Sequence, residues 1–92
     1  MTDIIVRRLA GPPNYQMLVT VETERGRTKH KVSFTEVDRR LLVDGRLDAE
    51  GLARASFEFL LARESNLSIL KEFRLSQIAD YYPDFYSEIA KL

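Results

Sequence analysis

Residues 15–34 contain two stretches of alternating apolar and polar side chains that flank Arg25-Gly26, and this pattern predicts a β-hairpin. Pairing Glu24 with Arg27 across a two-residue turn fixes the register of every pair further along both strands. The predicted pairs are Val21 with His30, Val19 with Val32, Met17 with Phe34 and Glu22 with Lys29. One face of the hairpin is therefore expected to be apolar and the other charged.

A third alternating stretch, residues 3–10, precedes the turn-forming sequence Gly-Pro-Pro-Asn and predicts another strand. Pairing Ala10 with Tyr15 sets this strand against residues 15–23, so that the three strands form an antiparallel meander. Val6 then faces Val19 and Ile4 faces Val21. The inner face of this sheet is expected to hold Ile4, Val6, Tyr15, Met17, Val19, Val21, His30, Val32 and Phe34.

Helix signals begin directly after the hairpin. Residues 35–38, Thr-Glu-Val-Asp, match a capping box and predict a short helix over 36–43 that Asp44-Gly45 ends. Asp48 is expected to cap a longer helix over 49–64, whose apolar residues cover more than half of its circumference. Such a helix is expected to be buried on two sides.

Shorter helices are expected in the last third of the chain. Ser65 or Asn66 is expected to cap one helix through residue 73, and Ser76 another through residue 82. Pro83 stops that helix and precedes a last one over 84–92. The side chains of Phe85, Ile89 and Leu92 recur on one face of this last helix, which predicts that the face is buried.

The expected fold is a single α+β domain over residues 1–92. Its β-meander occupies residues 1–34, and four to five short-to-medium α-helices in residues 35–92 pack on one face of the sheet. The 92 residues include no cysteine, which excludes a disulfide framework and a thiolate metal site. Because no apolar run is long enough for a signal peptide or a membrane span, we expect a cytoplasmic protein without membrane contact.

Charge bears on the class of partner. The chain carries 14 basic and 14 acidic residues, but residues 1–34 hold six Lys and Arg against three Asp and Glu. The sheet half is therefore basic by three charges and residues 35–92 are acidic by three. A neutral chain is unlike a dedicated DNA-binding protein, so nucleic acid is not the expected partner. A weak nucleic-acid-binding or regulatory role for the basic sheet half remains the alternative.

The sequence contains no pattern typical of an enzyme. His30 is the only histidine, and the pattern places it on the apolar face without a nucleophile or second base at a recognisable spacing. One histidine and scattered carboxylates do not form the ligand cluster of a metal site. The four glycines stand singly, so there is no phosphate-binding or dinucleotide-binding loop. We expect no catalytic residues, no metal and no cofactor.

Two surfaces are candidates for binding a partner. The first is the outer sheet face, where apolar and basic side chains mix and no predicted helix covers them. Its residues are Ile5, Arg7, Leu9, Leu18, Arg27, Lys29 and Lys31. The second is the aromatic cluster of Tyr81, Tyr82, Phe85 and Tyr86. The expected function is a small protein–protein interaction module that binds an unknown protein partner or associates weakly with itself.

Residues 69–92 also resemble a helix-turn-helix, with residues 75–79 in the place of its first helix and 84–92 in the place of its recognition helix. The charges do not suit DNA, because the second helix carries Asp84 and Glu88 against the single Lys91.

Four runs of sequence resemble small bacterial proteins of no assigned function. The runs are residues 55–64, residues 68–73, residues 75–78 and Tyr82-Pro83, and the likeness covers about residues 50–85. The resemblance implies a bacterial cytoplasmic setting, and it implies no activity and no site residues.

Overall fold

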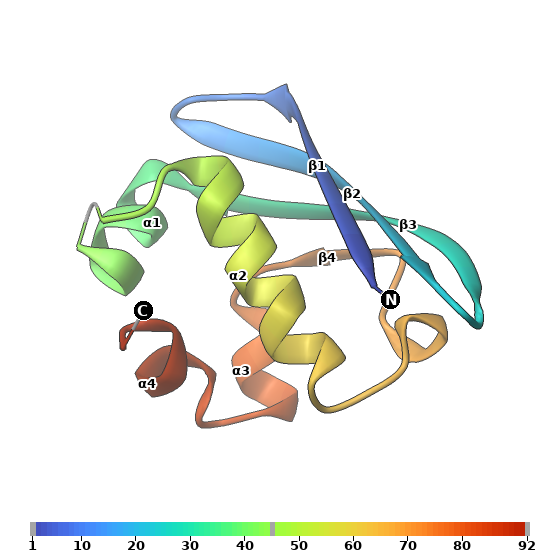
Figure 1. Cartoon of the computed structure of the whole chain (residues 1–92). Helices are drawn as coiled ribbons and strands as arrows, with labels where there is room; N and C mark the ends of the chain where they lie inside the picture. Colours follow the sequence, from blue (N-terminus) through green and yellow to red (C-terminus); the bar gives the residue numbers. More distant parts are fainter. Residues whose placement is uncertain (1, 45, 92) are drawn as a thin grey trace.

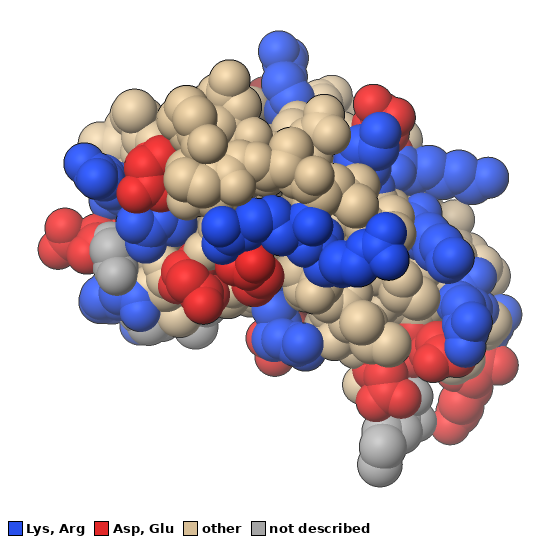
Figure 2. All heavy atoms as spheres, turned by 90° about the horizontal axis from the view of Figure 1, so that it is seen from above, with Lys and Arg blue, Asp and Glu red and all other residues tan. Residues whose placement is uncertain are grey.

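The computed structural model of the chain describes residues 2–44 and 46–91, in which helices cover one face of a four-stranded sheet (Figure 1). The strands follow the order β1 (Asp3–Ala10), β2 (Asn14–Thr23), β3 (Gly26–Thr35) and β4 (Glu72–Arg74) across the sheet. The helices are α1 (Glu36–Val43), α2 (Ala49–Leu61), α3 (Gln77–Tyr81) and α4 (Phe85–Ile89), with a 3-10 helix, η1 (Asn66–Ser68). Figure 2 looks onto the other face of the sheet. The expected α+β class is confirmed.

The hairpin of β2 and β3 forms where it was predicted, but the predicted register differs from the observed one by two residues. The turn lies at Glu24-Arg25, because the Thr23 hydroxyl accepts a 3.0 Å hydrogen bond from the Arg25 N–H and Gly26 ends the turn at a φ of 131°. The observed pairs are Tyr15 with Phe34, Met17 with Val32, Val19 with His30 and Glu22 with Arg27. Side chains alternate with a period of two, so this shift leaves every residue on its predicted face.

The register of β1 on β2 agrees with the prediction over most of its length. Val6 faces Val19 and Ile4 faces Val21, as expected. The predicted pair of Ala10 with Tyr15 is wrong, because an irregularity between Arg8 and Ala10 places Ala10 opposite Gln16.

The fourth strand corrects the prediction for residues 66–73, which were expected to form a helix. They form η1 and then β4, which pairs with β3 in parallel. The Lys31 N–H donates to the Lys71 carbonyl at 2.7 Å, and the Leu75 N–H donates to the Ser33 carbonyl at 2.9 Å. The sheet is therefore mixed and four-stranded instead of a three-stranded meander.

Capping side chains set the starts of α1 and α2. The Thr35 hydroxyl accepts from the Asp38 N–H at 3.1 Å and the Asp38 carboxylate accepts from the Thr35 N–H at 2.9 Å, which confirms the predicted capping box. Asp48 accepts from the Gly51 N–H at 2.6 Å, also as predicted. The helix α2 ends at Leu61, three residues before the predicted end, and Gly45 lies outside the described residues.

The C-terminal helices are shorter than predicted. Ser76 precedes α3 without a side-chain capping bond, and α3 and α4 have five residues each. Residues 72–74 are a strand, and Phe85 and Ile89 of the supposed recognition helix are buried, so the helix-turn-helix likeness does not hold. The predicted burial of Leu92 falls outside the described residues.

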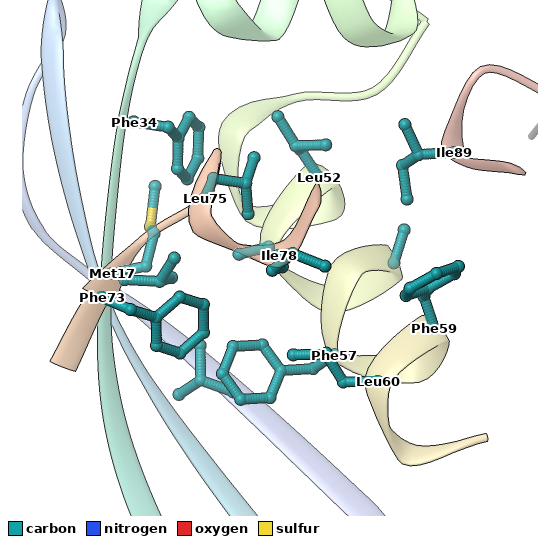
Figure 3. Close-up of a cluster of buried hydrophobic side chains, with 14 of the residues drawn as sticks. Met17, Phe34, Leu52, Phe57, Phe59, Leu60, Phe73, Leu75, Ile78 and Ile89 are labelled. Carbon is teal, nitrogen blue, oxygen red and sulfur yellow. The ribbon is translucent and has the colours of Figure 1, made fainter. Parts of the chain in front are cut away.

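The sheet and the helices share one hydrophobic core, which Figure 3 shows in part. Seven of the nine side chains predicted for the inner face are buried, whereas Ile4 and Val6 on β1 are partly buried. On the side of α2 that faces the sheet, the centre of the Phe57 ring lies 5.3 Å from the centre of the His30 ring. Phe59 on another side of α2 lies 5.1 Å from the Phe85 ring of α4. The expected burial of this helix on two sides is thus confirmed.

Candidate functional site

The outer sheet face brings side chains from all four strands into rows. Arg7, Leu18, Lys31 and Glu72 lie directly opposite one another on β1, β2, β3 and β4. Their side chains point away from the helices because their inward-facing neighbours fill the core. Leu18 therefore lies between two cationic side chains at the middle of the sheet.

A second row lies beside the first. It consists of Ile5, Thr20 and Lys29, and the side chain of Ile5 is 55% exposed. Ile5 is a diagonal neighbour of Leu18, a distance at which long side chains on a sheet still touch. Figure 2 shows Lys and Arg side chains spread over this face between uncharged areas.

Two of the predicted site residues lie apart from these rows. Leu9 falls at the irregularity of β1, has no directly opposite residue on β2, and is 41% exposed. The guanidinium of Arg27 donates to the Glu22 carboxylate at 2.6 Å and 3.0 Å, so its charge is partly neutralised. The structure thus brings together Ile5, Arg7, Leu18, Lys29 and Lys31 and leaves Leu9 and Arg27 at the margins.

Sequence reasoning missed the contribution of β4 to this face. Glu72 lies opposite Lys31 and Arg74 lies opposite Ser33, and both β4 side chains are exposed. The signal was the alternation of buried Phe73 with these two polar residues, a period of two that indicates a strand. The run is only three residues long, which makes it easily mistaken for part of a helix.

The second candidate, the aromatic cluster, is divided between core and surface. Phe85 is buried and Tyr86 is 43% exposed. Tyr81, 68% exposed, and Tyr82 line an open groove of about 200 Å³ between α2 and α3. The other lining residues are Leu60, Glu64, Ser68, Ile69, Leu70, Phe73, Gln77 and Ile78. The four aromatic residues therefore do not form one surface.

One polar contact joins two of the residues that line this groove. The Tyr82 hydroxyl donates a hydrogen bond to the Glu64 carboxylate. This bond, together with burial, raises the pKa of Tyr82 above its usual 10.0, so the hydroxyl keeps its proton to a higher pH than that of a solvent-exposed tyrosine.

His30 is held inside the core by two contacts. Its Nδ1 lies 2.8 Å from the Leu70 carbonyl oxygen and its Nε2 lies 2.8 Å from the Thr28 hydroxyl. The side chain is 1% exposed. Both ring nitrogens are therefore occupied, and the ring is out of reach of a substrate at the surface.

The described part of the chain contains neither a cluster of metal ligands nor a helix that could span a membrane. In residues 2–44 and 46–91, no three His, Asp or Glu side chains lie close enough together to hold a metal ion. Within the same ranges, no helix has the length and apolar character needed to cross a membrane.

The outer sheet face and the groove are thus defined by geometry alone. The similarity of residues 50–85 to small bacterial proteins, and the bacterial setting it implies, stay predictions, because no protein-family model, no curated protein and no solved structure matches this chain.

Proposed function

We propose that this protein is a small non-enzymatic interaction module whose outer sheet face docks a protein partner. The observation that supports this proposal is the row of Arg7, Leu18 and Lys31, which no helix of the described residues covers. Exposed Ile5 adjoins this row. An apolar centre with charged residues around it is the usual arrangement of a protein-binding surface. The expected partner segment carries apolar side chains flanked by Asp or Glu.

A non-enzymatic role agrees with the state of the only histidine. Both ring nitrogens of His30 are engaged by Leu70 and Thr28, so the imidazole has no free nitrogen for proton transfer. The groove at Tyr82 supplies a carboxylate, Glu64, but that carboxylate is already bonded to the Tyr82 hydroxyl.

The alternative is weak nucleic-acid binding by the same face, or a regulatory role that depends on it. One observation favours this alternative. Four basic side chains form no ion pair with any residue in the described ranges and are therefore available to phosphates, namely Arg7, Lys29, Lys31 and Arg74. Two observations weigh against it. No outward-facing residue of the four strands is aromatic, so bases would find no stacking partner. Asp3, Glu22 and Glu72 share the face and would repel phosphates.

The proposal is tested by a single substitution at the middle of the face. Leu18→Lys should reduce capture of a partner from a lysate of the source cell at least tenfold, since it puts a charge at the apolar centre of the row, where an apolar side chain of the partner would pack. The matched control is Leu41→Lys on α1, where Leu41 is 78% exposed and remote from the sheet face. Both variants should keep the thermal melt of the parent. Equal capture by all three proteins would reject the docking role.

Salt dependence separates the two candidates. A fluorescent 20-nucleotide single-stranded RNA is titrated with the parent protein at low and at physiological salt. Phosphate contacts would make its affinity fall steeply, by a factor set by the number of counterions released. We expect no specific binding of the RNA, and capture of the protein partner that changes little with salt because its centre is apolar. Binding of the RNA at low salt that falls steeply at physiological salt would favour the alternative.

A further inference from the structure

The edge strand β1 carries an open row of backbone groups. It is the first strand of the sheet and pairs on one side only, with β2 (Figure 1). Alternate residues of an antiparallel strand point their N–H and C=O groups away from the partner. Within residues 2–44 and 46–91, β1 makes no backbone hydrogen bond except to β2. An eight-residue edge of this kind is a template for another strand.

The opposite edge of the sheet is protected. The strand β4 has three residues, and the Gln77 side chain accepts from the Arg74 N–H at 2.8 Å. This side chain takes the place that an added strand would need. Along residues 3–8 of β1, by contrast, no side chain or backbone group in the described ranges occupies the open backbone edge.

Side chains along β1 are also incompletely covered. Ile4 and Val6 point towards the core but are only partly buried, and Ile5 on the other face is 55% exposed. Asp3 and Arg7, four residues apart, form no ion pair with any described residue. The strand thus presents apolar surface and two unpaired opposite charges along one edge.

We propose that β1 pairs with β1 of a second copy of this chain, antiparallel and centred on Ile5. A two-fold axis at Ile5 places Ile5 against itself, and Asp3 against Arg7 of the second copy at both ends. On the inner face, Ile4 then lies opposite Val6 of the second copy. Opposite charges and apolar pairs directly across a strand pair both stabilise it. The strand is therefore complementary to itself in this register.

Other symmetric registers do not give this match. A two-fold pairing must join residues of the same parity, because otherwise the core faces of the two copies would lie on opposite sides. Centring on Val6 sets Ile5 against Arg7 and Ile4 against Arg8, which buries charge against apolar side chains. Centring on Arg7 sets two arginines against each other, a like-charge pair that destabilises the sheet. Centring on Ile4 shortens the overlap and leaves Arg7 without its acidic partner.

The register centred on Ile5 would join the two sheets into one continuous sheet. The contact is short, below the roughly 1,200 Å² that most specific interfaces bury, so the dimer should be weak, with a Kd of about 100 µM. This inference does not depend on the docking role of the outer face. Leu18, on β2, lies outside the β1 contact, so Leu18→Lys should leave the dimer unchanged.

The test measures self-association of charge-reversed variants by sedimentation equilibrium. Asp3→Lys and Arg7→Glu each place like charges opposite one another in the proposed register, so each variant alone should dimerise at least tenfold more weakly than the parent. In an equimolar mixture of the two, the reversed charge of one variant meets the reversed charge of the other at one end of the strand pair. At the other end, the native Arg7 of the first variant faces the native Asp3 of the second. Opposite charges therefore meet at both ends of the heterodimer, so the mixture should recover about the parent affinity.

The double variant supplies a second rescue, within one chain. Asp3→Lys combined with Arg7→Glu in one chain exchanges the two charges, so opposite charges face each other again at both ends of the two-fold pair. This double variant should dimerise at least as well as the parent. Amide hydrogen exchange in β1 should slow in the double variant as its concentration rises, as it does in the parent.

The matched control separates this register from general attraction between charged proteins. Asp3→Lys combined with Arg54→Glu has the same net charge as the rescued double variant, but Arg54 is exposed on α2. This control should stay as weak as Asp3→Lys alone. A parent that stays monomeric up to about 1 mM overturns the inference, as does equal association of the two double variants. Retention of the parent affinity by Asp3→Lys alone would also overturn it.

Discussion

At the scale of single residues, His30 shows how a titratable side chain is placed in an apolar sheet face. The Leu70 carbonyl can only accept a hydrogen bond, so the Nδ1 atom of His30 carries the proton. The Nε2 atom then accepts from the Thr28 hydroxyl, which itself accepts from the Asn66 side-chain amide at 3.0 Å. Each donor in this series of hydrogen bonds has an acceptor when the imidazole ring is neutral.

This arrangement predicts a dependence of stability on pH. Burial lowers the pKa of His30 below its usual 6.5, and the Leu70 carbonyl offsets this only in part. Below about pH 6.5 the unfolded chain therefore binds a proton that the folded chain resists, so the free energy of unfolding should fall from pH 7 to pH 5. Urea melts at pH 7, 6 and 5 measure this fall.

A control variant and a second group define the pH window. His30→Gln should abolish the slope between pH 7 and pH 5, whatever its effect on absolute stability. Arg39, with Tyr15 and Arg40, lowers the pKa of Glu36 from 4.5 to about 2, so stabilisation by this carboxylate is lost only below about pH 4.5. The same slope in parent and variant would show that another group titrates.

At the scale of elements, the sequence predicted the helices and strands whose signals lie within a few neighbouring residues. The capping residues Thr35 and Asp48 place the starts of α1 and α2 correctly. The strand β4 could not be predicted in this way, because its partner is a segment about forty residues away and its three residues carry no turn signal. The apolar residues of 67–73 also fit a helical period as well as an alternating one, and pairing with β3 decided between them.

Among the elements, α2 should contribute most to stability. The Phe57 side chain is 0% exposed and lies between the His30 ring and the Phe73 ring, at 5.3 Å and 5.9 Å. Phe57→Ala should lower the free energy of unfolding by about 3 to 5 kcal/mol, because it removes these contacts and leaves a cavity. Leu60→Ala should cost about 2 to 5 kcal/mol.

An exposed position on the same helix serves as the control for these core variants. Arg54 is exposed, so Arg54→Ala should change the free energy of unfolding by no more than about 0.5 kcal/mol. All three variants are compared with the parent in urea melts. A value for Phe57→Ala as small as that for Arg54→Ala would mean that α2 is not the centre of the core.

At the scale of the whole molecule, the alternation of the strands predicted which residues face outwards. The two-residue error in the hairpin register changed which residues lie side by side, but it did not change their face. The assignment of Ile5, Arg7, Leu18, Lys29 and Lys31 to one surface could therefore be predicted. The position of Arg27 beside Glu22 could not, since it depends on where the turn falls.

The molecule also depends on contacts between its middle and its C-terminal end. Phe85 and Ile89 of α4 are buried against α2, where the Phe85 ring meets the Phe59 ring at 5.1 Å. The Arg46 guanidinium donates to the Ala90 carbonyl at 2.6 Å, and Arg63 pairs with Asp84 at 3.0 Å. The last helix is thus attached by apolar packing and by charged groups at both of its ends.

Deletion of residues 83–92 should therefore lower the melting temperature strongly and broaden the transition. Burying Phe85 and Ile89 stabilises the fold by about 3 to 6 kcal/mol together, a large part of the roughly 5 to 15 kcal/mol that holds a typical domain folded. The double variant Phe85→Ala with Ile89→Ala should show the same effect in a chain of full length. Lys91→Ala removes only an exposed ion pair with Glu88 and should melt as the parent does. A truncated protein with an unchanged, sharp melt, measured by circular dichroism, would show that α4 is not part of the cooperative core.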